Sequence, residues 1–163
     1  MDRQSYGENY QSHLLEQYKL YIEMADRISS RRVQMNRFYI SLLSGLIAII
    51  SVFVNTDFFP KLQGTKLQYI TLFLLGLLAL IFCWVWHSNI HSYKQLNSAK
   101  FKVISEIEKH MPLSIYKIEW EILKKDREYK VYMEQTLVEK YVPFLLAIPY
   151  LILSIYSLIA LMR

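Results

Sequence analysis

Seven basic, aromatic and amide residues form the candidate ligand-binding group of this sequence. They are Arg27, Arg31, Arg32, Tyr93, Lys94, Asn97 and Lys100. The three arginines lie close together on one predicted helix. On a second predicted helix, Tyr93, Asn97 and Lys100 follow an i, i+4, i+7 pattern, and Lys94 flanks them. Arginine binds phosphate through its planar fork, and tyrosine rings stack on nucleic-acid bases. The group therefore predicts an anion pocket between two helices, suited to a nucleotide or an oligonucleotide.

A plainer alternative accounts for the same residues. Basic side chains next to a membrane bind anionic lipid, at about 1 kcal/mol for each residue near the surface. Glu23 and Asp26 also lie close enough to Arg27 in the sequence to neutralise part of the group. From these residues alone, lipid contact or internal ion pairing is the favoured interpretation, and a ligand pocket is the second.

Cys83, His87 and His91 follow an i, i+4, i+8 spacing, so a helix would place all three on one face. Such side chains suit zinc, but Cys83 lies inside an apolar stretch, and the histidines suit the headgroup level or helix contacts. Packing is favoured over a metal site, and the sequence predicts neither a metal nor another cofactor. A single cysteine also excludes an intramolecular disulfide.

The sequence contains no recognisable catalytic constellation. It lacks a glycine-rich phosphate loop, an HExxH pattern and a nucleophile elbow. Glu106/Glu108 and Glu119/Glu121 are carboxylate pairs, but i, i+2 spacing places the two partners on different helix faces. We expect these carboxylates to be solvated charges, and we predict no catalytic residues and no enzyme activity.

Three apolar segments must position these residues. Segments 38–54, 67–86 and 142–162 contain no charged residue, and about 20 apolar residues suffice for a helix to span a bilayer. The predicted fold is all-α, with three transmembrane helices of which the first two extend into a cytoplasmic helical bundle. The predicted parts are a cytoplasmic amphipathic helix (1–37), a first transmembrane helix (38–54), an external turn (55–66), a second transmembrane helix (67–87), a cytoplasmic helical segment (88–140), and a third transmembrane helix with a short external tail (141–163).

The basic residues predict the orientation in the membrane. Of 19 Lys and Arg residues, six lie in 1–37 and ten in 89–140. Because cytoplasmic loops carry the excess of basic residues, we predict a multi-pass membrane protein whose N-terminus is cytoplasmic and whose C-terminus lies on the opposite side.

The distribution of helix breakers predicts long helices. Residues 8–44 contain neither Pro nor Gly, so the first helix should run unbroken into the membrane. The second should continue inward until Pro112 ends it. Ser114 should then cap a short helix to Leu123, followed by a charged turn over 124–130 and a final helical piece over 131–140.

Small and hydroxylated residues form a stripe in the first transmembrane helix. The candidate pore-lining residues are Ser41, Ser44, Ala48 and Ser51. The third transmembrane helix has a similar stripe, which consists of Ala147, Tyr150, Ser154 and Ser157. Such stripes are most often helix-packing surfaces. In a cyclic oligomer the first stripe could instead line a weakly selective or hydrophobically gated pore.

Several polar motifs carry a family resemblance. They are residues 18–32, residues 92–104 followed by 106–108, Leu113, Tyr116, residues 119–120 and residues 139–143. With these motifs, about residues 14–145 resemble the RipA-like family of small bacterial oligomeric membrane proteins. The transmembrane segments match that family only in being apolar.

The resemblance implies a homo-oligomer of the bacterial inner membrane rather than an enzyme, with a tetramer favoured and other cyclic oligomers left open. With the cytoplasmic N-terminus predicted above, the C-terminus would be periplasmic. Proteins similar to this one also act as membrane effectors of anti-phage defence. In the Hailong type, the effector HalA is an ion-channel-like tetramer restrained by single-stranded DNA oligomers, which a partner nucleotidyltransferase makes. The implied function is an ion-channel-like effector gated by a cytoplasmic nucleotide or single-stranded DNA oligomer, with a nucleotidyltransferase encoded nearby.

A second function fits the same residues. A non-conducting RipA-like scaffold or stress-response oligomer would bind protein partners through the segment 89–140. This alternative predicts partners that co-purify with the protein and no effect of nucleotides.

Overall fold

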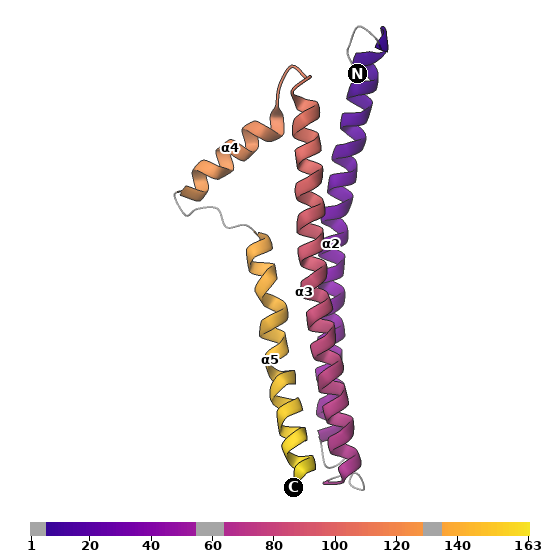
Figure 1. Cartoon of the computed structure of the whole chain (residues 1–163), viewed down its shortest axis with the longest axis vertical. Helices are drawn as coiled ribbons and strands as arrows, with labels where there is room; N and C mark the ends of the chain where they lie inside the picture. Colours follow the sequence, from indigo (N-terminus) through magenta and orange to yellow (C-terminus); the bar gives the residue numbers. More distant parts are fainter. Residues whose placement is uncertain (1–5, 55–63, 129–134) are drawn as a thin grey trace. The chain divides into compact units, whose positions relative to one another are not determined.

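The computed structural model describes residues 6–54, 64–128 and 135–163. Within these ranges the chain is all-helical, with four helices: α2 (Tyr10–Val54), α3 (Lys66–Glu108), α4 (Ile115–Glu128) and α5 (Gln135–Met162) (Figure 1). Three of them are long and apolar enough to cross a membrane, namely α2, α3 and the part Glu139–Met162 of α5. The predicted all-α fold with three transmembrane helices is confirmed at this level.

The chain divides into two compact units. Unit 1 comprises Met1–Arg32 and Ser92–Gln135, and unit 2 comprises Val33–His91 and Thr136–Arg163. Unit 1 holds the seven candidate ligand residues, whereas unit 2 holds the apolar segments and the candidate pore-lining residues.

Both long helices are unbroken, because neither contains Pro and the single internal glycine of each, Gly45 or Gly76, does not interrupt it. However, α3 ends at Glu108 rather than at Pro112. The chain leaves the helix through three tighter bonds, in which the N–H groups of Lys109, His110 and Met111 each donate to the carbonyl three residues earlier. Proline disfavours the α conformation in the residue before it, so the helix is already unwinding ahead of Pro112.

The N-terminus of α3 is capped by side chains. Thr65 Oγ1 accepts a hydrogen bond from Gln68 N at 3.3 Å, and Gln68 Oε1 accepts one from Gly64 N at 2.8 Å. This exchange resembles a capping box, which satisfies N–H groups that have no partner within the helix. Gly64 has a φ of 70°, a conformation that glycine adopts without steric cost.

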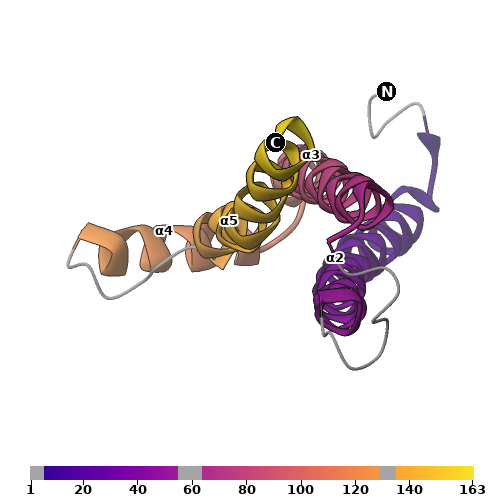
Figure 2. The same ribbon diagram turned by 90° about the horizontal axis from the view of Figure 1, so that it is seen from below.

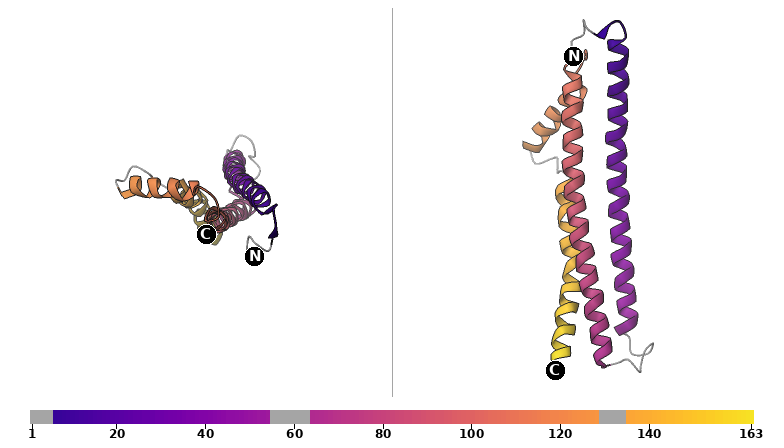
Figure 3. Two further views of the ribbon diagram at one scale, coloured as in Figure 1. Left: turned by 90° about the horizontal axis from the view of Figure 1, so that it is seen from above. Right: turned by 45° about the vertical axis from the view of Figure 1, so that its right-hand side comes forward.

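Unit 2 is a bundle in which α3 lies beside both α2 and α5 (Figures 2 and 3). The rings of Tyr39 and Trp86 stack with their centroids 5.6 Å apart. Two hydrogen bonds flank this stack: Trp86 Nε1 donates to Asn36 Oδ1 at 2.9 Å, and Asn89 Nδ2 donates to the Tyr39 hydroxyl at 3.1 Å. These contacts align α2 and α3 as antiparallel neighbours.

The contact between α3 and α5 depends on Gly76. A Cβ at this position would collide with Ser154 Oγ and press on the Tyr150 carbonyl. Tyr150 in turn donates a hydrogen bond to the Leu43 carbonyl of α2. The buried Tyr150, Ser154 and Ser157 therefore pack inside unit 2, which confirms the packing interpretation for the stripe of the third transmembrane helix.

The charged turn predicted over 124–130 is wrong for residues 124–128, because α4 continues to Glu128. Four of these five residues are good helix formers, and the segment contains no Pro or Gly, so charge alone does not end the helix. Residues 129–130 lie outside the described ranges. Likewise, of the piece predicted over 131–140, the first four residues lie outside them, and the remainder begins α5.

Candidate functional site

Unit 1 pairs the first part of α2 with the last part of α3. Its buried core contains Tyr18, Ala25 and Ile104. Two contacts set an antiparallel register: the Tyr18 hydroxyl donates to Glu108 Oε1 at 2.9 Å, and Lys100 Nζ lies 4.9 Å from the centre of the Tyr21 ring. In this register Arg27, Arg31 and Arg32 lie at about the level of residues 91–97 of α3.

The structure divides the seven candidate ligand residues into two groups. Four are half-buried, namely Arg32, Tyr93, Asn97 and Lys100. Their helical positions match those of the core residues, so they occupy the facing sides of α2 and α3. Three are exposed, namely Arg27, Arg31 and Lys94. Arg27 donates to Glu23 Oε1 at 2.6 Å on the exposed surface, as the internal-pairing alternative predicted for this residue.

The four facing residues combine charge with aromatic surface. Lys100 lies over the Tyr21 ring at a cation–π distance, and Tyr21 was not singled out from the sequence. Its i, i+4 spacing from Ala25 was the available signal. Asn97 Oδ1 is buried and has no hydrogen-bond partner within the described residues. A buried acceptor without a partner is costly, so this position suits a ligand that donates a hydrogen bond.

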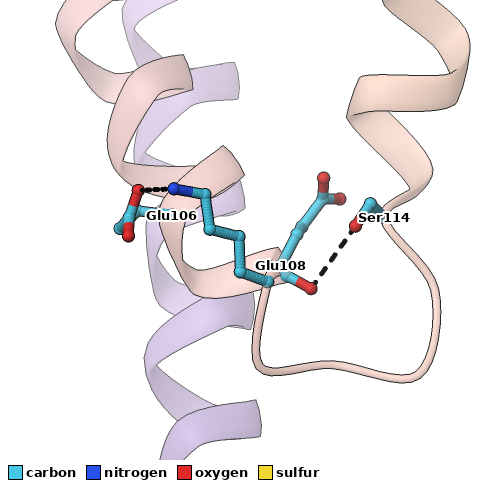
Figure 4. A network of polar contacts seen from close by, with 4 residues as sticks. Glu106, Glu108 and Ser114 are labelled. Carbon is cyan, nitrogen blue, oxygen red and sulfur yellow. Dashed lines mark hydrogen bonds and ion pairs between the residues drawn. The ribbon is translucent and has the colours of Figure 1, made fainter.

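Glu108 is the main correction to the sequence interpretation. It was expected to be a solvated charge, yet its residue is 0% exposed. Its Oε1 accepts the Tyr18 hydroxyl at 2.9 Å and the Tyr116 N–H at 3.0 Å. Figure 4 shows Glu106 and Glu108 pointing in different directions from the end of α3, as the i, i+2 argument predicted. Glu106 is exposed and accepts a hydrogen bond from Lys109 Nζ at 2.6 Å.

The carboxylate of Glu108 also replaces the predicted cap of α4. Ser114 precedes the helix, as expected of a cap residue, but Ser114 Oγ donates to the Glu108 carbonyl at 3.4 Å (Figure 4). The N–H of Tyr116, which a capping side chain would normally satisfy, donates to Glu108 instead. One side chain thereby joins α2, α3 and the start of α4.

These contacts shift the ionisation of the neighbouring groups. Burial, together with the hydrogen bond to Glu108 and its charge, raises the pKa of Tyr18 to about 12. Burial and the charges of Glu119, Glu108 and Asp26 raise the pKa of Tyr116. Tyr18 is therefore a neutral hydrogen-bond donor near pH 7. The hydrogen bond from Lys109 lowers the pKa of Glu106.

Cys83, His87 and His91 have different surroundings. Cys83 is 4% exposed within the core of unit 2, and the His87 ring lies 4.8 Å from the Phe144 ring. His91 is exposed. No three His, Cys, Asp or Glu side chains come together as metal ligands within the described ranges. Helix contacts account for Cys83 and His87.

The four candidate pore-lining residues are all exposed in the single chain. With about 3.6 residues per turn, they occupy the side of α2 opposite the buried Tyr39, Leu43 and Ile50. Gly45 lies beside them, with nothing within 4 Å of the place its Cβ would take. The stripe of α2 therefore packs against no helix of its own chain in the described structure.

Comparison with known families matches the chain to a model of the octameric membrane protein family (8xMP) over residues 15–159. The chain belongs to this family. Membership in 8xMP agrees with the three apolar helices and identifies a multi-pass, oligomeric membrane protein. The 8xMP description gives eight subunits for its members. Comparisons with curated proteins and with solved structures found no significant match.

Proposed function

We propose that the chain forms a homo-oligomeric, ion-channel-like effector of the bacterial inner membrane. It is gated by a cytoplasmic nucleotide or by a single-stranded DNA oligomer from a partner nucleotidyltransferase encoded nearby. It acts in anti-phage defence, as its resemblance to RipA-like and Hailong-type effectors implies, and it is not an enzyme. The observation that carries the channel proposal is the uncovered stripe of Ser41, Ser44, Ala48 and Ser51 on α2.

The stripe suits the lumen of a ring. Its side chains are small, and the hydroxyl of Ser51 has a hydrogen-bond acceptor within α2, because Oγ donates to the Ile47 carbonyl at 2.8 Å. Three helices of one chain cannot enclose a pore, so identical chains must surround it, and cyclic symmetry follows because all copies share one membrane orientation. The 8xMP description favours eight subunits over the four favoured from the resemblance.

The ligand part of the proposal rests on unit 1. The facing residues Arg32, Tyr93, Asn97 and Lys100 supply cations, a stacking ring and an amide. The exposed Arg27, Arg31 and Lys94 remain candidates, and they suit contact with anionic lipid as well. A ligand gates the channel only if it binds the closed and open states with different affinities. Since α2 and α3 run unbroken from these residues into the apolar segments, they are the elements through which binding would act.

Purified protein in liposomes tests conduction directly. Ion flux should be low with the oligomer bound and high without it if the ligand restrains the channel, and the reverse if the ligand opens it. A protein that carries no flux in either condition, while eluting as an intact oligomer, would contradict the channel proposal and favour the scaffold.

Binding of a fluorescein-labelled single-stranded DNA oligomer tests the ligand site. Replacing Arg32 or Lys100 with Ala should weaken binding and reduce its dependence on salt, because each removes a phosphate contact. Lys19→Ala, an exposed lysine outside the group, is the control. If Arg32→Ala and Lys100→Ala bind the DNA oligomer as tightly as the control Lys19→Ala does, Arg32 and Lys100 are not part of the site.

A non-conducting scaffold that binds protein partners through 89–140 is the second candidate. One observation favours it: Ile115, Ile118 and Trp120 of α4 are exposed outside the candidate transmembrane helices. Water does not solvate such a surface well, so it requires a protein or lipid cover. Co-purifying partners, without any response of the protein to nucleotides, would support this candidate.

A further inference from the structure

Helix α4 exposes a regular apolar stripe. Ile115, Ile118 and Ile122 follow an i, i+3, i+7 pattern, which places them on one side of the helix. They are 56%, 42% and 58% exposed. The other apolar side of α4 already packs against its own chain, because the Tyr116 ring lies 5.5 Å from that of Phe101. The isoleucine stripe is therefore a second apolar surface that the described chain leaves uncovered.

A bilayer is a poor cover for this stripe. Helices that lie on membranes carry mainly Lys and Arg on their polar side. The sequence of α4, IYKIEWEILKKDRE, instead balances four basic residues with four acidic residues. This balance favours a protein surface, and membership in an octameric family supplies one, namely another copy of the chain.

A complementary surface exists on α2. Leu20 and Met24 are four residues apart and are 56% and 39% exposed. Their helical positions lie away from the buried side that holds Tyr18 and Ala25. Within unit 1, α4 and α2 lie on opposite sides of α3 (Figures 1 and 2). One edge of the unit thus presents isoleucines and the other presents leucine and methionine.

The charges beside these two surfaces also match. Glu119 lies next to the isoleucine stripe and is exposed, while Arg31 is exposed on the outer side of α2. A pairing of Glu119 with Arg31 across the contact favours docking in one orientation over the alternatives.

We propose that the Ile115/Ile118/Ile122 stripe of α4 docks on the Leu20/Met24 surface of α2 in the neighbouring copy. Different surfaces meet in such a contact, and repeated contacts of this kind close a ring when the rotation between copies permits. Within one chain the Glu108 carboxylate binds both Tyr18 of α2 and Tyr116 of α4, so the two surfaces lie near the same level. Copies that share one membrane orientation keep this level. The contact rests on the oligomeric assembly in the proposed function and is independent of conduction and ligand.

Cysteine cross-linking tests this contact. The double variant Met24→Cys/Ile118→Cys should give a ladder of cross-linked species beyond the dimer under mild oxidation in native membranes. Each single variant, and the wild type with its buried Cys83, should give none. Dimers from Ile118→Cys alone would indicate a two-fold contact between α4 helices and would overturn the proposal, as would the absence of any ladder.

Assembly state provides a second measurement. Ile118→Glu should convert the oligomer in mild detergent into smaller species with unchanged helical content, whereas Lys117→Glu, on another side of α4, should not. Glu119→Arg should weaken assembly, and adding Arg31→Glu should restore it. If a fluorophore on Ile118→Cys is quenched by lipid-borne quenchers in the assembled protein, α4 lies on the membrane and the proposal is wrong. None of these measurements requires ion flux, so a failed channel assay leaves the contact testable.

Discussion

A single carboxylate, that of Glu108, joins three helices of unit 1. It accepts hydrogen bonds from Tyr18 of α2 and from the first turn of α4, while its own backbone ends α3. Hydrogen bonds to charged groups contribute about 1.5–3 kcal/mol each. Removing this side chain should therefore release the start of α4 more than any exposed carboxylate would.

Replacement of Glu108 by Ala should accelerate hydrogen exchange at the start of α4. Loss of one charged hydrogen bond, about 1.5–3 kcal/mol, corresponds to roughly 10- to 150-fold faster local exchange. Hydrogen exchange is measured by mass spectrometry on detergent-solubilised protein. The rates for peptides that contain Tyr116, in the variant and in the wild type, give this ratio. Glu106→Ala, which loses only the exposed contact with Lys109, is the control. Equal protection in both variants would mean that the carboxylate of Glu108 does not hold α4.

Tyr18 should make folding stability depend on pH under alkaline conditions. Its pKa rises to about 12 in the folded chain, so the folded state holds the proton more tightly than the unfolded state does. The resulting stabilisation is complete below about pH 10 and is lost as the pH rises towards 12. Glu108 and Tyr116 face the Tyr18 hydroxyl, and both raise its pKa.

Unfolding midpoints of the wild type and of Tyr18→Phe, taken at several pH values through this window, measure the effect. The wild type should lose more stability than the variant as the pH rises. Parallel curves would show that folding does not raise the pKa of Tyr18.

At the scale of the helices, α3 and α5 can approach closely because Gly76 of α3 has no side chain. Gly76 lies where a Cβ would meet Ser154 Oγ and the Tyr150 carbonyl. Small residues allow transmembrane helices to approach closely, and such packing replaces the hydrophobic driving force that operates in water. The position therefore tolerates added volume poorly.

Replacement of Gly76 by Leu should lower the thermal unfolding midpoint of the solubilised protein, or its yield as folded protein. Overpacking of this kind typically costs about 1–3 kcal/mol. Gly45→Ala adds a side chain where nothing lies within 4 Å and should leave the fold intact.

A double variant separates the collision from other effects. Gly76→Ala should be better tolerated together with Ser154→Ala, because the second change removes the Oγ that collides with the new Cβ. If the stability changes caused by the two substitutions are instead additive, the close approach at Gly76 does not limit the packing of the two helices.

At the scale of the assembly, the α2 stripe can be tested without knowledge of the ligand. Ser44→Cys should make ion flux sensitive to a charged, membrane-impermeant thiol reagent, because the modified side chain would narrow a water-filled pore. Leu74→Cys, an exposed position on α3, should give protein whose flux the reagent does not change. If the reagent changes neither variant's flux while the protein conducts, the stripe lies at a helix contact and the lumen is lined by other residues.

Much of the fold was predictable from residue order, because local patterns decide it. The charge-free segments and the absence of breakers over 8–44 predicted long membrane-crossing helices, and α2 and α3 have that form. The helix ends were less accurate. Charge was taken as the end of α4 at Leu123, although charged residues are compatible with a helix and α4 continues to Glu128.

The candidate site was only partly predictable, because side chains three or four positions apart share a face whichever way that face points. Spacing placed Arg27 and Arg31 together, but only packing decides that these two are exposed while Arg32 is half-buried. The seven residues stay predictions for ligand binding. Tyr21, which contacts Lys100, was missed because its partner lies on another helix.

The sequence by itself determined an all-helical chain with three membrane-crossing segments, because apolar length and helical periodicity are local properties. The tertiary structure alone decided which polar residues are buried. In the sequence Glu108 looks like one more surface charge, yet folding gives its carboxylate a hydrogen bond from Tyr18, 90 positions away in the chain, and another from the first turn of α4. Burial of a charge depends on partners brought together by folding, and no local pattern encodes them.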